Sequence, residues 1–378
     1  MNRSLKHGKA SGTDGLPHEL YLEHGNKLLP ILLPIYRNLS NPGIEPPPSY
    51  GQLLTVLIPK IDKPANTADY RPISLVNSDY KILAKVWAKR LGLVLSEIIG
   101  HHQKGFVPSR DGRTHVITTQ ALMDYYQNNS TTRGAFLFLD FKKAFDCVSH
   151  EAMNTTLRDL GFPPRLCDLI KNLYSRSCTS IIVNDGLTDS IPITRGTWQG
   201  CPLSPLIYAI IAELFNQSII NNPDFSGHTK ANLHKRITAY ADDTLAHISN
   251  YRDVDNIQKS LDNFKQATGL EIQPRTCEAV STNKFDEYWS HQIHTKSKPD
   301  ILVEYQRREC VESLGVPVGT ANMQQHTYNK WCEIRDKFFR ASSFWSHQSI
   351  SSLYFRTRIA KAMILSLLWY HIMPLFCL

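Results

Sequence analysis

The stretch AYADDTLAHI, from Ala239 to Ile248, places two adjacent carboxylates, Asp242 and Asp243, inside a run of apolar and small residues. Burying an ionised carboxylate is costly and two neighbouring ones repel each other, so a cation, a basic side chain or water has to compensate them. The flanking residues have the pattern of two short strands, which predicts a hairpin with the aspartates at its turn. A plain hairpin turn is the simplest interpretation of the pair.

A second carboxylate stretch, AFLFLD, runs from Ala135 to Asp140. A short apolar run ended by a carboxylate is typical of a buried strand, here with Asp140 at its tip. Asp242 follows 102 residues later, so the two side chains can meet only if their strands lie side by side in one sheet. Because successive strand residues face opposite sides, Asp140 and Asp242 are favoured over Asp243 as ligands of one ion.

The chemistry of such a carboxylate cluster depends on its donor atoms. Hard oxygen ligands without a His or Cys cluster nearby suit Mg²⁺ or Mn²⁺ rather than zinc. Two such ions would clamp an in-line phosphoryl displacement. A structural site closed by salt bridges is the alternative.

Composition sets limits on the class of protein. The 378 residues are 42% hydrophobic and carry a formal net charge of +8, which predicts two or three globular lobes and favours a polyanionic partner. The eight cysteines form no CxxC pair, so they predict neither a disulfide framework nor a zinc knuckle. No secretory segment follows Met1, which predicts an intracellular protein.

The C-terminal stretch AMILSLLWYHIMPLFCL, from Ala362 to Leu378, carries no formal charge over 17 residues. That length is at the short edge of a membrane span, but the run RTRIAK before it fits a packed helix, and we expect no membrane segment. A chain that stops inside an apolar run predicts a truncated C-terminal region.

Between these landmarks, strands and helices alternate throughout the chain. Apolar runs, helical spacing and capping residues predict four further elements. They are a strand over Leu53–Ile58, a helix capped by Ser78 that ends near Gly100, a helix capped by Ser149 that ends at Gly161, and a helix from Ser204-Pro205 to Ile220.

Seven stretches together resemble the ordered motifs of reverse transcriptases encoded by non-LTR (LINE-type) retrotransposons. In chain order they are GKASGTDGLP (8–17), LIPK (57–60), YRPISLVNSDYKILAKVWAKRL (70–91), QKGFVPSR (103–110), FLDFKKAFDCVSH (138–150), RGTWQGCPLSP (195–205) and AYADDT (239–244). The resemblance implies an α+β right-hand polymerase fold with an antiparallel palm sheet flanked by helices. It predicts fingers at 1–133, palm at 134–165 and 195–319, a connection at 166–194, and a truncated thumb at 320–378.

The resemblance also implies the reaction. Asp140, Asp242 and Asp243 would be the palm carboxylates for two Mg²⁺ ions, with Mn²⁺ as a possible substitute. A DNA primer 3′-hydroxyl would attack the α-phosphate of a dNTP opposite an RNA template. We expect the chain to be part of a larger retrotransposon polyprotein, or a degenerate copy, acting in the nucleus or the cytoplasm.

Five further residues match nucleotide-binding positions of the family. Arg71 and Lys60 would meet the triphosphate, because cations neutralise phosphate charge. Phe145 would lie beneath the sugar and exclude a ribose 2′-hydroxyl. Gln199 and Gly200 would lie along the nucleotide. The alternatives are solvated loop charges for the two cations and a core position for the phenylalanine.

Two features depart from the family pattern. Arg275 stands where the family usually has a lysine, and an arginine cannot readily give up a proton. Trp198 is unusual inside its motif, where Cys201 is interpreted as a packing residue. Two rival functions stay open: an RNA-dependent RNA polymerase that uses Asp140 and Asp146, and an inactive RNA-binding scaffold, against which the three retained aspartates count.

Overall fold

The computed structural model describes residues 5–129, 134–230, 233–281 and 306–346. The chain divides into two compact units, each built from three separate stretches. We call them the first unit (residues 1–108, 141–215 and 261–271) and the second unit (109–140, 216–260 and 272–378).

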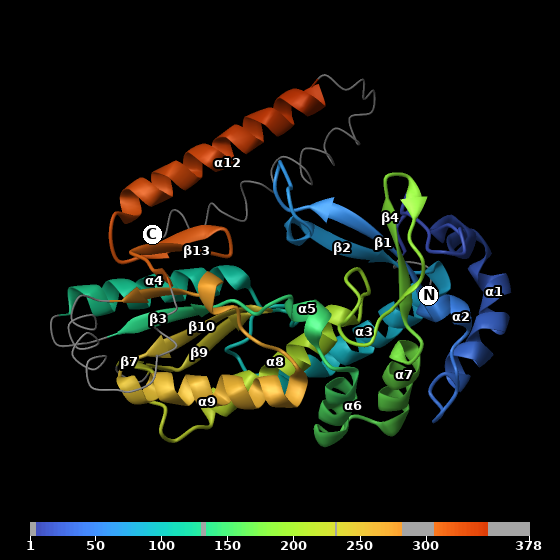
Figure 1. Ribbon diagram of the computed structural model, residues 1–378, viewed down its shortest axis with the longest axis horizontal. Coiled ribbons are helices and arrows are strands. Elements are labelled where there is room, and N and C mark those ends of the chain that lie inside the picture. Colours follow the sequence, from blue (N-terminus) through green and yellow to red (C-terminus); the bar gives the residue numbers. More distant parts are fainter. Residues whose placement is uncertain (1–4, 130–133, 231–232, 282–305, 347–378) are drawn as a thin grey trace. The chain divides into compact units, whose positions relative to one another are not determined.

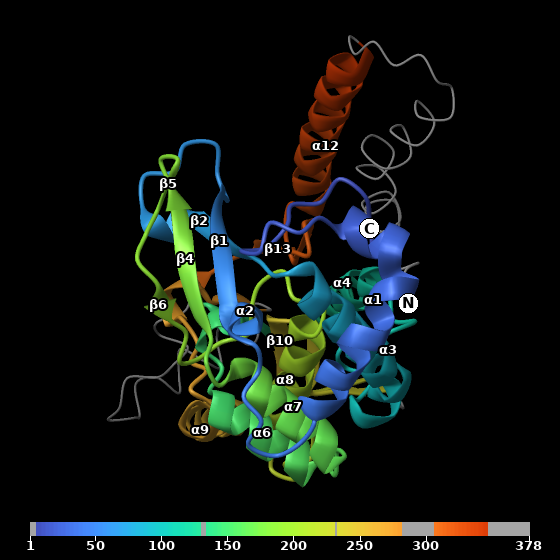
Figure 2. The same cartoon turned by 90° about the vertical axis from the view of Figure 1, so that its right-hand side faces the viewer.

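The first unit contains a five-stranded sheet in which β1 lies between β2 and β4 (Figures 1 and 2). The apolar run Leu53–Ile58 lies in β1, as predicted. It pairs with β2 in antiparallel and with β4 in parallel orientation. The strands are β1 (Gln52–Pro59), β2 (Tyr70–Leu75), β4 (Cys178–Val183), β5 (Gly186–Leu187) and β6 (Ile191–Pro192).

Helices make up most of the remaining first unit. The predicted helix over residues 78–98 forms, but its cap was predicted wrongly: Asn77 is the N-cap and Ser78 is the first helical residue, whose hydroxyl donates to the Leu16 carbonyl. Ser149 does cap its helix, accepting from the Ala152 amide. The helices are α1 (His18–Asn38), α2 (Pro48–Gly51), α3 (Ser78–Ile98), α5 (Ala144–Cys147), α6 (His150–Asp159), α7 (Pro164–Tyr174) and the larger part of α8 (Ser204–Ile220).

The second unit is built on another five-stranded sheet, with strand order β12-β11-β3-β10-β9 (Figure 1). The predicted AFLFLD strand is β3, the central one, and its neighbours on both sides run antiparallel to it. The short β11–β12 pair is parallel, so the expected antiparallel sheet holds for every other pair. The strands are β3 (Ala135–Leu139), β9 (Ile237–Tyr240), β10 (Asp243–Ile248), β11 (Glu278–Ser281) and β12 (Gln306–Arg307).

Helix α4 (Gly112–Asn128) packs against this sheet through a buried apolar cluster. Met123 and Tyr126 of the helix meet Phe136 of β3 and Leu245 of β10 there. The hairpin of β13 (Cys310–Ser313) and β14 (Val316–Gly319) and helix α12 (Met323–Ser346) add further members to the same cluster. The hairpin of β7 (His228–Lys230) and β8 (Leu233–Lys235) and the first turns of α9 (Tyr251–Thr268) complete the described part of the unit.

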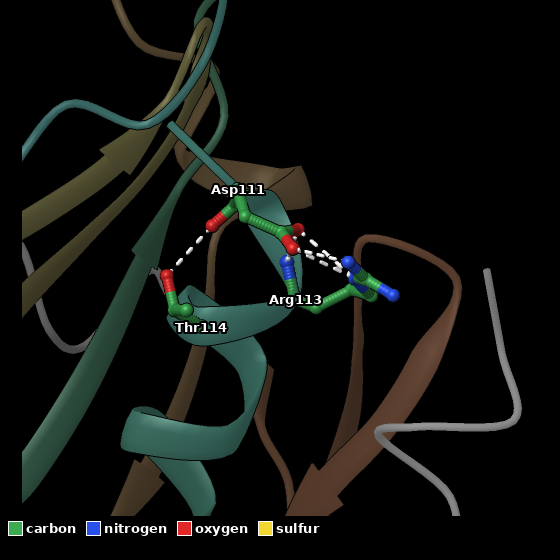
Figure 3. Close-up of polar contacts among 3 residues, drawn as sticks. All are labelled: Asp111, Arg113 and Thr114. Carbon is green, nitrogen blue, oxygen red and sulfur yellow. Dashed lines mark hydrogen bonds and ion pairs between the residues drawn. The ribbon is translucent and has the colours of Figure 1, made fainter. Parts of the chain in front are cut away.

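The start of α4 is fixed by its cap (Figure 3). The Asp111 side chain accepts from the Arg113 amide at 2.9 Å and from the Arg113 guanidinium, while the Thr114 hydroxyl donates to the Asp111 carbonyl at 2.6 Å. Hydrogen bonds from the Arg113 side chain lower the pKa of Asp111, which favours the ionised form of this capping carboxylate. His115, the residue after Thr114, lines a cavity of the second unit.

In the described part of the chain, no helix is long and apolar enough to cross a membrane. The apolar stretch 362–378 lies outside the described residues. The predicted α+β class, with mixed helices and sheets, is confirmed.

Candidate active site

The paired aspartates lie at a two-residue hairpin loop between β9 and β10. Tyr240 pairs with Asp243, so Ala241 and Asp242 form the loop itself. Ala241 has φ of +59°, in the left-handed region that the first loop residue of a type II′ turn requires and that usually belongs to glycine. The predicted hairpin is therefore confirmed, with backbone strain beside the carboxylates.

Strand register brings the distant carboxylate to this hairpin. Thr244 of β10 is opposite Leu139 of β3, and continuing that antiparallel ladder by one residue sets Asp243 opposite Asp140. Directly opposed residues share one face of a sheet. Asp140 and Asp243 accordingly line one cavity of about 190 Å³. From the sequence we favoured Asp242 over Asp243 beside Asp140, whereas the strand register places Asp243 there. Its other lining residues are His115, Phe138, Leu139, Thr244, Leu245, Thr276, Glu278, Glu312, Ser313 and Leu314.

A short segment before β11 holds Asp140 in place. The Thr276 hydroxyl donates to Oδ2 of Asp140, and the Gln273 amide donates to the Asp140 carbonyl at 2.8 Å. The Asp140 amide in turn donates to Sγ of buried Cys277 at 3.3 Å. Sequence reasoning missed this clamp, since Thr276 and Asp140 lie 136 positions apart.

Burial and nearby negative charge raise the pKa values of the two adjacent aspartates. Removal from water, then the charges of Asp242 and Asp140, raises the pKa of Asp243 to about 6. Removal from water and the Asp140 charge also raise the pKa of Asp242. The charge repulsion expected from the sequence is thus present, and a cation bound among these groups would relieve it.

The donor set fits a hard divalent cation. Among the described residues, no group of three or more His, Cys, Asp or Glu side chains is placed to hold a metal ion by itself. Magnesium, however, commonly uses one or two carboxylates together with water and substrate phosphates rather than an all-protein cage. Asp140 and Asp243 in one cavity, with Asp242 next to them, meet that requirement.

The nucleotide-binding candidates all belong to the first unit, where two motifs meet through their backbones. The Thr197 amide donates to the Phe145 carbonyl at 2.6 Å, and the Gly196 amide donates to the Val148 carbonyl at 2.7 Å. Gly196 has φ of +87°, and a Cβ there would lie 2.6 Å from the Asp146 carbonyl oxygen. The loop of RGTWQGCPLSP can therefore follow α5 only with glycine at this position.

Gln199 and Gly200 connect the same loop to β2. The Ser74 amide donates to the Gln199 carbonyl at 2.7 Å, and the Gln199 side-chain amide donates to Oδ1 of Asp146 at 3.0 Å. Gly200 has φ of +108°, and a Cβ there would lie 2.7 Å from the Ser74 carbonyl oxygen. The structure thus brings Gln199 and Gly200 together with the strand that carries Arg71.

Phe145 is half-buried between two rings. Tyr208 lies 4.5 Å away between ring centroids, and Phe106 meets Phe145 edge-on at 6.2 Å. Phe106 is 42% exposed and has φ of +60°, an uncommon conformation for a phenylalanine. Sequence reasoning did not single out Phe106, although this residue lies in the QKGFVPSR motif.

Lys60 and Arg71 are exposed at the ends of two paired strands. Arg71 of β2 is opposite Ile58 of β1, and Lys60 follows β1 directly. The Lys60 ammonium donates to the Ala68 carbonyl at 2.9 Å. Burial raises the pKa of Asp146, while Gln199, Lys143 and Lys60 act against that rise, so Lys60 lies within electrostatic reach of α5.

Trp198 and Cys201 have structural explanations. The Trp198 ring is 2% exposed and lies between Tyr80 and Tyr174, at centroid distances of 5.1 Å and 4.7 Å. Sγ of Cys201 is 3.2 Å from the Tyr80 hydroxyl, and burial raises the pKa of this thiol. The prediction that Cys201 is a packing residue is confirmed.

Comparison with known proteins identifies the family. The family model described as reverse transcriptase (RNA-dependent DNA polymerase) matches residues 58–320. A solved telomerase structure from Candida tropicalis, truncated from its C-terminal domain, is 10% identical over 83% of this chain and 62% of that chain, with a TM-score of 0.48.

Three relatives come from mobile elements. The 149 kDa protein of transposon TX1 from Xenopus laevis is 29% identical over 71% of this chain and 20% of that protein. The Pol polyprotein of retrotransposable element R2 from Popillia japonica is 28% identical over 62% of this chain and 33% of the polyprotein. The RNA-directed DNA polymerase from mobile element jockey of Drosophila melanogaster is 25% identical over 93% of this chain and 36% of that enzyme.

This chain thus spans about a fifth to a third of the length of these relatives. They bear out the predicted resemblance to non-LTR retrotransposon proteins, and the family model covers more than half of the sequence. The chain therefore belongs to the reverse transcriptase (RNA-dependent DNA polymerase) family.

Proposed function

We propose that this chain is the polymerase part of a non-LTR retrotransposon protein and adds dNTPs to a primer 3′-hydroxyl on an RNA template. The observation that carries the proposal is the shared cavity of Asp140 and Asp243, with Asp242 in the adjoining turn. A hairpin turn alone would not require a distant carboxylate to be clamped beside it.

In this proposal the three aspartates hold the divalent cations, Mg²⁺ by preference and Mn²⁺ as a substitute. Bound there, two cations would activate the primer hydroxyl and stabilise the charge of the leaving pyrophosphate. Thr276 keeps one Asp140 oxygen fixed by its hydrogen bond, which leaves the other oxygen free to bind a cation. Arg275 supplies positive charge but no proton, so the proton donor to pyrophosphate is not assigned to it.

The first unit supplies the nucleotide contacts. Arg71 and Lys60 neutralise the triphosphate, and Arg71 can do so through two parallel hydrogen bonds. The ring of Phe145 occupies the space of a ribose 2′-hydroxyl and offers it no partner. Gly200 lets its loop approach Ser74 closely, which holds Gln199 in place along the nucleotide. The implied partners are an RNA template, a DNA primer and the rest of the polyprotein, in the nucleus or the cytoplasm.

Primer extension tests the proposal. Purified wild type is given a primed RNA template, Mg²⁺ and either dNTPs or rNTPs, beside Asp242→Asn and the control Asp224→Asn, whose exposed carboxylate pairs with Arg252. We expect dNTP extension by wild type and by the control, and a loss of about a thousandfold in Asp242→Asn.

Each rival function has its own outcome in this assay. Preferential incorporation of rNTPs would identify an RNA polymerase. Binding of the primed template without extension by the wild type would identify an inactive scaffold. Equal extension by wild type and Asp242→Asn would remove the proposed role of that carboxylate.

A further inference from the structure

The first unit contains another cavity, of about 660 Å³. None of the nucleotide-binding candidates lines it. It lies between α1, the loop that follows α1, α3 and the start of α7. Its apolar wall comes from leucines of α1 and from Leu83, Val86 and Trp87 of α3. Such a mostly apolar hollow with a few placed polar groups is the usual form of a binding site.

Three arginines from three different elements meet at this cavity. They are Arg37 in the last turn of α1, Arg90 of α3 and Arg165 in the first turn of α7, and all three are exposed. No Asp or Glu is among the described residues that line the cavity. The cavity therefore carries three positive charges without an acidic residue in its walls, which favours an anionic occupant.

One of these arginines forms a stack with an aromatic ring. The Arg90 guanidinium lies 5.1 Å from the centroid of the Trp87 ring. Nucleic-acid bases stack on aromatic rings and on guanidinium planes, and each stacked base adds to affinity without a sequence requirement. The same cavity thus combines a stacking platform with cations placed to meet phosphates.

The walls are held by buried hydrogen bonds. The Asn172 side-chain amide, 5% exposed, donates to the carbonyl oxygens of Leu39 and Asn41, both at 2.9 Å. The Tyr36 hydroxyl donates to the Asp79 carbonyl at 2.8 Å and ties α1 to α3. A cavity whose loop is already fixed loses little entropy when it binds a ligand.

We propose that this cavity binds a single-stranded polynucleotide, as a contact separate from the carboxylate cavity and independent of polymerase activity. Asn38, Ser40 and Asn41 in its lining are residue types that contact phosphate and sugar oxygens, and they add no charge. An acidic peptide could pair with the arginines, but the Arg90–Trp87 stack provides for a planar base, which favours the polynucleotide.

The test measures binding of a fluorescent twelve-nucleotide oligouridylate to the full chain at several salt concentrations. The test variant replaces Arg37, Arg90 and Arg165 by Gln. The matched control replaces Lys27, Lys89 and Lys171 by Gln, which removes the same charge from exposed positions outside the cavity lining. We expect the arginine variant to bind about tenfold or more weakly and its log–log salt slope to fall by about 2, since single strands lose about 0.7 per phosphate contact.

The control should lose less than about threefold. Equal losses of affinity in the two triple variants would overturn the proposal. They would show that binding depends on the overall positive charge and not on this cavity. Trp87→Leu should weaken binding about tenfold with an unchanged salt slope, since it removes stacking but no charge. An unchanged affinity in Trp87→Leu would equally contradict a base platform.

Photocrosslinking with 4-thiouridine in the oligonucleotide locates the contact on wild type without any substitution. A crosslink to a peptide with Tyr36 or Trp87 is expected, and its absence counts against the site. If poly-glutamate of equal charge displaces the oligonucleotide as well as an unlabelled copy does, an acidic peptide is the better occupant. Extension on a short primed template should persist in the arginine variant, so loss of polymerase activity and loss of this site are separately visible.

Discussion

The two units position their functional residues in different ways. In the second unit, Asp140 and Asp243 meet because two strands pair in a fixed register, and one hairpin supplies Asp242. In the first unit, the loop that carries Gln199 and Gly200 is joined by backbone hydrogen bonds to α5, which carries Phe145, and to β2. The pairing register of the strands follows from their apolar pattern. The close contacts of the loop depend instead on two single glycines, Gly196 and Gly200. The two units should therefore respond differently to substitution.

Gly200→Ala should have the largest effect, because alanine disfavours the positive φ and its methyl group would clash with Ser74. A methyl group would lie 2.7 Å from the Ser74 carbonyl at φ of +108°. We expect a loss of about 3 kcal/mol in the free energy of unfolding and strongly reduced extension. Gly43→Ala measures the cost of the positive φ alone, since Gly43 has φ of +69° and no atom lies within 4 Å of an added Cβ. This substitution should lower the free energy of unfolding by about 1 kcal/mol. Equal costs in urea unfolding would show that the close approach is unimportant.

Arg71→Ala should raise the KM for dNTP about tenfold to a hundredfold, because it removes charge-assisted hydrogen bonds to the triphosphate. Steady-state extension with varied dNTP measures this. Arg176→Ala is the matched control, since that guanidinium forms a surface pair with Glu45. A KM equal to that of the control would make Arg71 a solvated strand charge, the alternative considered from the sequence.

Phe145→Ala should reduce discrimination against rNTPs about tenfold, because space for the 2′-hydroxyl opens. Phe106→Ala should produce a smaller loss of the same kind, since that ring only supports Phe145 edge-on. The ratio of kcat/KM for dNTP and rNTP is the measurement. If discrimination is unchanged in Phe145→Ala while stability falls, the ring is a core residue and does not contact the sugar.

The smallest expected effect is on the free energy of unfolding when no divalent cation is bound. The pKa of Asp243 is raised to about 6, so the folded state binds this proton more tightly than the unfolded chain does. Its contribution to stability is thus present at low pH and is lost as pH rises towards 6. Asp243→Asn with chelator should therefore stabilise the protein at pH 7 by about 1 kcal/mol, allowing for screening of a partly exposed group, with the gain vanishing near pH 4. Destabilisation at pH 7 would contradict the proposed repulsion.

Several features of the fold were predictable because they rest on local patterns. The AFLFLD strand, the hairpin around AYADDT and the Ser149 cap are all present. Family membership confirms the right-hand polymerase fold implied by the motifs. The boundaries of fingers, palm and thumb stay predictions, as do the roles of the individual site residues.

Other features depend on contacts that a sequence pattern does not contain. Asn77, not Ser78, precedes α3, and the Ser78 hydroxyl instead donates to the Leu16 carbonyl far away in the chain. The Thr276 hydrogen bond to Asp140 joins residues 136 positions apart. The parallel pairing of β1 with β4 likewise joins two strands whose sequences contain no pattern that predicts this pairing. The carboxylates were predictable because each stands out within a local apolar pattern, whereas Thr276 has no such local mark.

The central claim is that carboxylates from separate stretches bind the same divalent cations. Electron paramagnetic resonance of Mn²⁺ tests it, with dNTP and a primer–template whose primer lacks a 3′-hydroxyl. We predict Mn²⁺ binding by wild type and Asp224→Asn, and affinity reduced about tenfold or more in both Asp140→Asn and Asp242→Asn, since each removes a charged ligand. Binding that survives either substitution unchanged would contradict a shared site.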